Sequence, residues 1–144
     1  MIPAFNENGL LPAGVHAATF DEFEQRFVYF DVSDRRYRLF DKLQQLLHQA
    51  RMSGIVRRIL FGGSFVTTKP EPNDFDCIIV LDPSVIGHEL GPSVYNMVSR
   101  RAARRAFGGD VIPVIEDSHY YHEYLRLFQS TRGNERMGIV EIEL

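Results

Sequence analysis

ILFGGSFVTTKPEPNDFDCI occupies residues 59–78 of the 144-residue chain. In it, an apolar run ends in Gly62-Gly63-Ser64, a polar loop with two prolines follows, and a second apolar run begins at Asp74-Phe75-Asp76. Successive side chains of a β-strand point to opposite faces, so two aspartates spaced two positions apart share a face. The segment therefore predicts two strands joined by a loop, with a glycine turn on one side and paired carboxylates on the other.

This pattern has a clear chemical interpretation. Two adjacent carboxylates, Asp74 and Asp76, repel each other unless a cation lies between them, and ligand sets made only of oxygen suit Mg²⁺ or Mn²⁺. Gly62 and Gly63 have no side chains, so a phosphate chain can approach their backbone amides, and Ser64 can add hydrogen bonds. The pattern predicts a site for a nucleoside triphosphate and a divalent metal. Lys69, in the loop between the two halves, either reaches the triphosphate or is merely exposed.

The same residues resemble the signature of the DNA polymerase beta-like nucleotidyltransferase superfamily, and most closely its small bacterial members from toxin–antitoxin and host-defence pairs. The resemblance implies an αβαβ core with a mixed sheet, two divalent metals, and an ATP-type substrate whose nucleotidyl group passes to a hydroxyl of RNA (for instance a tRNA end) or of a protein. It also implies a third carboxylate from a later strand. Asp110 and Glu116 flank the candidate strand at residues 111–115, and the choice between them stays open, with Asp110 favoured.

Two other functions fit the same residues. The chain could be a catalytically weak nucleotide-binding partner in a toxin–antitoxin or defence system, or a domain that binds no ligand. A proper third carboxylate favours the enzyme over the binding module.

The remaining sequence predicts an α/β (α+β) fold, with a nucleotidyltransferase-like mixed sheet and flanking helices in one compact domain. Residues 1–18 contain two prolines and two glycines with no sustained period, which predicts an irregular arm ahead of a domain at residues 19–144. Apolar spacing and capping residues predict helices at about 19–27, 35–52, 95–107 and 118–128, and strands at 55–61, 74–81, 111–115 and 137–144. Ser33 or Asp34 is expected to cap the second helix.

Charge and aromatic residues point to local rather than global functions. The net charge of −3 gives no field that would gather nucleic acid, so contacts with polyanions must be local. Four arginines near one helix end form either a phosphate-binding patch or a solvated face, and they are Arg100, Arg101, Arg104 and Arg105. A stripe of aromatic residues in the helix at 118–128 is expected to pack in the core rather than to stack on a base.

The lone Cys77 excludes an intramolecular disulfide and a zinc site built from several cysteines. It lies in an apolar run, which predicts a small buried side chain in a reducing compartment. The N-terminus lacks the pattern of a signal peptide, and the apolar runs are too short to span a bilayer. We therefore expect a cytoplasmic protein with no membrane partner.

Overall fold

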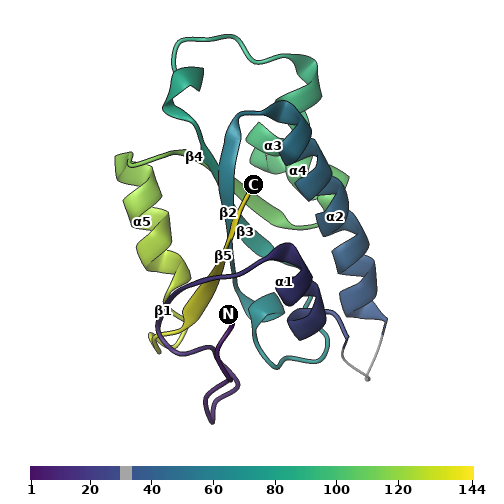
Figure 1. Cartoon of the computed structure of the whole chain (residues 1–144), viewed down its shortest axis with the longest axis vertical. Helices are drawn as coiled ribbons and strands as arrows, with labels where there is room; N and C mark the ends of the chain where they lie inside the picture. The colour runs from purple at the N-terminus through teal and green to yellow at the C-terminus, as the bar shows by residue number, and fades with distance from the viewer. Residues whose placement is uncertain (30–33) are drawn as a thin grey trace.

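The computed structural model describes residues 1–29 and 34–144, and its centre is a five-stranded sheet in the order β1-β5-β2-β3-β4 (Figure 1). Strand β2 pairs antiparallel with β3 and β5, whereas β1 with β5 and β3 with β4 are parallel. The α+β class with a mixed sheet is thus confirmed. The strands are β1 (Gly14–Ala17), β2 (Val56–Gly62), β3 (Asp76–Leu81), β4 (Asp110–Ile115) and β5 (Gly138–Glu143), and the α-helices are α1 (Phe20–Phe27), α2 (Arg35–Ser53), α3 (Tyr95–Val98), α4 (Arg100–Phe107) and α5 (His119–Phe128).

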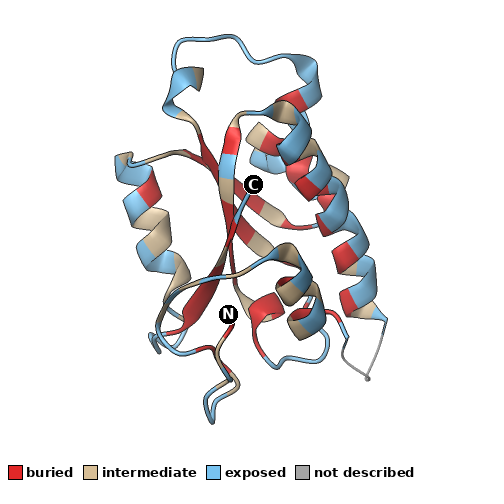
Figure 2. Cartoon of the chain, in the orientation of Figure 1, coloured by how far each residue is buried: buried red, intermediate tan, exposed pale blue. Residues whose placement is uncertain are grey.

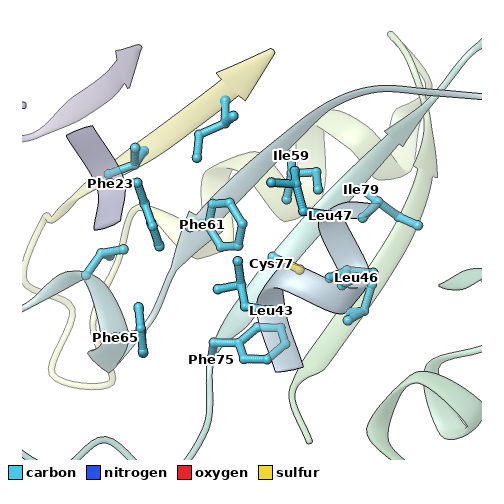
Figure 3. Close-up of a cluster of buried hydrophobic side chains, with 14 of the residues drawn as sticks. Phe23, Leu43, Leu46, Leu47, Ile59, Phe61, Phe65, Phe75, Cys77 and Ile79 are labelled. Carbon is cyan, nitrogen blue, oxygen red and sulfur yellow. The ribbon is translucent and has the colours of Figure 1, made fainter. Parts of the chain in front are cut away.

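The sheet has helices on both faces, so the central strands β2, β3 and β5 are largely buried, whereas β1 has no buried residue (Figure 2). Helices α1, α2 and α4 pack on one face, where alternate residues of β2 and β3 join Phe23, Leu43 and Leu46 in the larger core (Figure 3). Helix α5 covers the other face with a smaller cluster around Ile78, Val80 and Tyr121. Cys77 is fully buried in the larger core, as expected.

Side-chain caps explain where several helices begin and end. Thr19 accepts a hydrogen bond from the Glu22 amide at the start of α1, and Ser118 accepts one from the Tyr121 amide at the start of α5, both as predicted. Gly54, in the left-handed region at φ 68°, ends α2. Asp34 occupies the N-cap position of α2 without a side-chain capping bond, and Ser33 lies outside the described residues.

The structure corrects three predictions about the elements. Gly14–Ala17 of the predicted irregular arm forms β1, because it pairs with β5 at the edge of the sheet. The arm is therefore part of the sheet rather than a segment ahead of the domain. The helix predicted at 95–107 is interrupted at Ser99, whose extended backbone ends α3 and whose hydroxyl caps α4. The strand predicted from Asp74 begins at Asp76.

Strand β4 forms the edge of the sheet, as its proline predicts. The Asp110 amide bonds to the carbonyl of Phe75, just before β3, and the Glu116 amide bonds to that of Leu81, so the even-numbered residues of β4 direct their N–H groups inward. Pro113 is odd-numbered and has no N–H, so it removes a donor from the exposed edge. Among the described residues, no helix has the length and apolar character that crossing a bilayer requires.

Candidate active site

The glycine turn lies at the end of β2 beside the first residue of β3. Gly63 has φ 70° and ψ −166°, a conformation open essentially only to glycine. A Cβ on Gly63 would overlap the Asp76 carboxylate, and a Cβ on Gly62 would meet the Phe128 ring at 2.7 Å. Gly63 therefore lets the turn pass directly over Asp76. Gly62 is buried against Phe128 of α5 and is not among the residues that line the cavity described next, so its contact with phosphates stays a prediction.

A cavity of about 540 Å³ opens next to this turn. One wall is polar and includes Gly63, Ser64, Asp74 and Asp76. Lys69 is exposed and also lines the cavity, and its contact with a triphosphate stays a prediction. The rest of the lining mixes the large apolar side chains of Leu10, Leu127, Phe128 and Met137 with the polar residues Ser130, Thr131 and Arg132. A cavity of this size with both polar and apolar lining suits a small ligand that carries both kinds of group.

Three carboxylates gather at this end of the sheet. Asp76 and Asp110 are direct partners in the parallel register of β3 and β4, so their side chains project from the same face. Asp74 precedes the strand, yet its charge raises the proton affinity of Asp76, and both line the cavity. Burial, then Asp74, then Asp110 raise the pKa of Asp76 to about 6. The sequence-predicted pair and the favoured third acid are thus brought together.

The alternative third acid, Glu116, lies elsewhere. It follows the far end of β4, where its amide bonds to the Leu81 carbonyl. Its carboxylate accepts from Arg58 at 2.7 Å and pairs with Arg57 at 3.1 Å. Asp76 and Glu116 are separated by the length of the strands, because Asp76 pairs with Asp110 and Leu81 pairs with Ile115. Asp110, and not Glu116, is therefore the acid that lies beside Asp76.

Two of the four arginines in the predicted patch belong to this site. Arg104 donates to Asp74 at 2.6 Å, and Arg100 donates to both oxygens of Asp110 at 3.0–3.2 Å. These residues are four apart and so share a face of α4. Arg101 and Arg105 are exposed on α4 and make no ion pair with another described residue. The patch therefore divides into two arginines bound to the acidic cluster and two on a solvated face.

Sequence reasoning missed Arg36, which organises the loop after the glycine turn. Its fully buried guanidinium donates to the carbonyls of Phe27, Phe65, Thr67 and Lys69 at 2.6–2.8 Å. Burial lowers the pKa of Arg36 to about 10, so the group stays charged at neutral pH. A single cation thus joins the end of α1 to the loop that carries Ser64 and Lys69. An arginine at the second position of a helix gives no sequence signal of this role, because its partners are backbone carbonyls.

The sequence also gave no sign that some apolar residues would line the cavity. Leu10 and Met137 come from opposite ends of the chain, and Thr68 bonds to the Gly9 carbonyl beside them. Of the aromatic residues of α5, Tyr121, Tyr124 and Phe128 pack in the smaller core cluster as predicted, whereas Tyr120 is 69% exposed, which contradicts the prediction for that residue. The Phe128 ring also reaches the cavity. Apolar spacing identified Phe128 as a core residue but could not show that one edge of the core lines a cavity.

The donor chemistry of the acidic cluster fits Mg²⁺ or Mn²⁺, since all three groups supply only carboxylate oxygen. The raised pKa of Asp76 also indicates a surplus of negative charge that a cation would relieve. Among residues 1–29 and 34–144, however, no three acidic, histidine or cysteine side chains are arranged closely enough to hold a metal ion. The arginine contacts give a reason, because Asp74 and Asp110 are directed toward α4.

Fold and site together define a mixed-sheet α+β protein with an acidic, glycine-lined cavity. The chain belongs to a family of unknown function, DUF6932, whose family model matches residues 3–143. The match includes the N-terminal arm and all five strands. No curated protein and no solved structure matches the chain. Membership of the nucleotidyltransferase superfamily therefore stays a prediction from the motif.

Proposed function

We propose that the protein is a metal-dependent nucleotidyltransferase that moves a nucleotidyl group from a nucleoside triphosphate to a hydroxyl acceptor on RNA or protein. One observation carries the proposal: a single cavity is lined by the glycine turn, Ser64, Asp74 and Asp76. Amides and a hydroxyl suited to bind phosphates thus face the same cavity as carboxylates suited to bind a divalent cation. Transfer of a nucleotidyl group needs both, because the reaction develops negative charge on phosphate oxygens.

In this proposal the chain's own residues divide the work. The Gly63 turn and Ser64 hold the triphosphate, with Lys69 at the rim. Asp74, Asp76 and Asp110 would hold Mg²⁺ or Mn²⁺, which supplies electrophilic assistance to the phosphates. The acceptor oxygen forms a bond to the α-phosphorus as the bond to pyrophosphate breaks, and Asp110 accepts the acceptor's proton. The apolar side chains of Phe128 and Met137 face the less polar part of the nucleotide.

The test is transfer of label from α-³²P nucleoside triphosphates to RNA and protein acceptors with Mn²⁺ or Mg²⁺. We expect Asp76→Asn to lower transfer about 100-fold or more, the scale seen when an electrostatic catalytic group is lost. Glu116→Gln is the matched control, because it makes the same acid-to-amide change at the far end of β4. Its rate of transfer per folded molecule is expected to stay within about threefold of wild type, which is far less than the loss caused by removing one catalytic group.

Two outcomes would contradict the proposal in different ways. Transfer that survives Asp76→Asn would remove the acidic cluster from the chemistry. Binding of Mn²⁺ and nucleotide without transfer to any acceptor would leave the alternative function, a nucleotide-binding partner module of a toxin–antitoxin or defence system.

A further inference from the structure

Arg100 and Arg104 occupy the carboxylates to which the proposed function assigns the metal. Arg104 Nη1 lies 2.6 Å from Asp74 Oδ2, and Arg100 Nη2 lies 3.0 Å from Asp110 Oδ2. The Asp76 carboxylate makes no side-chain hydrogen bond or ion pair with any residue in the described part of the chain, although the charges of Arg104 and Arg132 lower its pKa. The cluster therefore has two carboxylates in direct contact with an arginine and one that is not.

Both ion pairs are exposed enough for another cation to replace the arginines. Both arginine side chains are 51% exposed, and both project from one face of α4, so neither is locked by packing. Exposed ion pairs contribute little to stability, because water screens them and long side chains lose entropy in making them. A divalent cation near Asp76 would also repel both guanidinium groups at contact distance.

The charges balance in such an exchange. Two guanidinium groups carry the same total charge as one divalent cation, so the cation can replace them without changing the net charge of the three-carboxylate cluster. The displaced arginines stay tethered to α4, next to the cavity. Their planar donor sets match phosphate oxygens in two-point contacts, which a triphosphate arriving with the cation would provide.

We propose that Arg100 and Arg104 act as an exchangeable lock: they pair with Asp110 and Asp74 in the free protein, are displaced by a divalent cation, and then bind the phosphates that accompany it. This inference rests on the proposed function, because it takes the acidic cluster to be the metal site. It adds that the free protein discriminates against a bare cation and favours a cation that arrives with a polyphosphate.

The experiment compares wild type with the double variant Arg100→Gln/Arg104→Gln by calorimetric titration. The first titrant is Mn²⁺ alone, and the second is inorganic tripolyphosphate at saturating Mn²⁺, which removes any effect of the base or of turnover. The double variant is expected to bind Mn²⁺ about tenfold tighter, since positive charges beside the cation are removed. It is expected to bind tripolyphosphate about tenfold or more weaker, since two charge-assisted contacts are lost.

The matched control is Arg101→Gln/Arg105→Gln, which removes the same charge from the solvated face of the same helix. It should change both affinities by less than about twofold, because exposed charges farther away are screened. Unchanged or weaker Mn²⁺ binding in the Arg100→Gln/Arg104→Gln variant would overturn the lock, as would an equal effect in the control. Circular dichroism of each variant checks that the fold is kept.

A further variant separates failure of the lock from failure of the proposed function. If Asp76→Asn binds Mn²⁺ as tightly as wild type, the acidic cluster is not the metal site, and both proposals fall. If Asp76→Asn abolishes Mn²⁺ binding while the double arginine variant binds as wild type does, the metal site stands and only the lock falls.

Discussion

Strands β3 and β4 have a cluster of three acids and two arginines near each end, and the two clusters behave differently. At the far end, Arg57 and Arg58 pair with Asp82, Glu116 and Glu141, so every carboxylate has an arginine partner. At the cavity end, Arg100 and Arg104 pair with Asp110 and Asp74, and Asp76 is left without such a partner.

The pKa values follow this difference. The backbone amide of Ser84 and the Arg57 guanidinium lower the pKa of Asp82. Burial beside two other acids raises the pKa of Asp76 to about 6. The far cluster, which we call the closed network, stabilises the fold, whereas the cavity cluster stores unfavourable charge that a ligand can relieve. Strongly perturbed acids in cavities often mark functional sites for this reason.

The largest effect on stability is expected from Glu116→Gln, which breaks the closed network. The change leaves Arg58, only 17% exposed, without its nearest charge partner. We expect the free energy of unfolding to fall by about 2–3 kcal/mol, just below the range for breaking a fully buried pair, because Arg58 keeps Glu141 and Tyr121 as partners. Urea denaturation at pH 7 measures it, with Glu123→Gln in an exposed pair as control. A loss equal to that of the control would show that the closed network is not structural.

Gly63→Ala tests whether the turn is built around Asp76. The new Cβ would meet the Asp76 carboxylate in a backbone conformation that suits glycine, so we expect a loss of about 2 kcal/mol. Gly87→Ala is the control, because Gly87 also has positive φ (79°) but no heavy atom within 4 Å of its added Cβ. If the two variants unfold at the same urea concentration, the contact with Asp76 has no energetic weight.

Asp76→Asn should do the opposite of Glu116→Gln and stabilise the free protein. The folded protein holds the Asp76 proton with a pKa of about 6, above the unfolded value of 3.8. The resulting advantage of the protonated form is therefore full below pH 3.8 and is lost as the pH rises through about 6. At pH 8 the variant avoids the cost of the charge, about 1–2 kcal/mol after allowing for solvent screening.

Thermal melts of wild type and Asp76→Asn across pH 3.5–8 check this sign. The two melting temperatures should converge at the acidic end of the series and separate above pH 6. A variant that is less stable than wild type at pH 8 would mean that the Asp76 carboxylate has a stabilising partner after all. Higher stability combined with lost transfer would be the trade-off expected at a functional site.

The smallest effect is expected from Asp74→Asn. Its pair with Arg104 is exposed, with side chains 28% and 51% accessible, so its loss should cost no more than about 0.5 kcal/mol. Urea denaturation at low and high salt measures it, and the small difference should vanish in 1 M NaCl because salt screens exposed pairs. A loss of unfolding free energy comparable to that of Glu116→Gln would show that the two clusters contribute equally to stability.

Much of this architecture follows from short-range patterns. Alternation of apolar residues places Val140 and Ile142 in one core cluster and Ile139 in the other, because a strand offers its side chains to two faces in turn. Thr19, Gly54 and Ser118 mark helix ends through bonds or backbone angles that involve only near neighbours. The spacing of Gly63 and Asp76 likewise predicted that the two residues would line one cavity, since a single loop joins them.

Contacts between distant segments could be seen only once the chain was folded. Strand β1 forms because β5, more than 120 residues later, offers it an edge, and no local pattern signals this. The selection of Asp110 over Glu116 depends on the register of β3 with β4 and on which arginines reach each acid. Local residue order thus predicted that Gly63, Ser64, Asp74 and Asp76 share one cavity. The pairing of charges in the cavity depends on the distances between side chains, and only tertiary packing sets those distances.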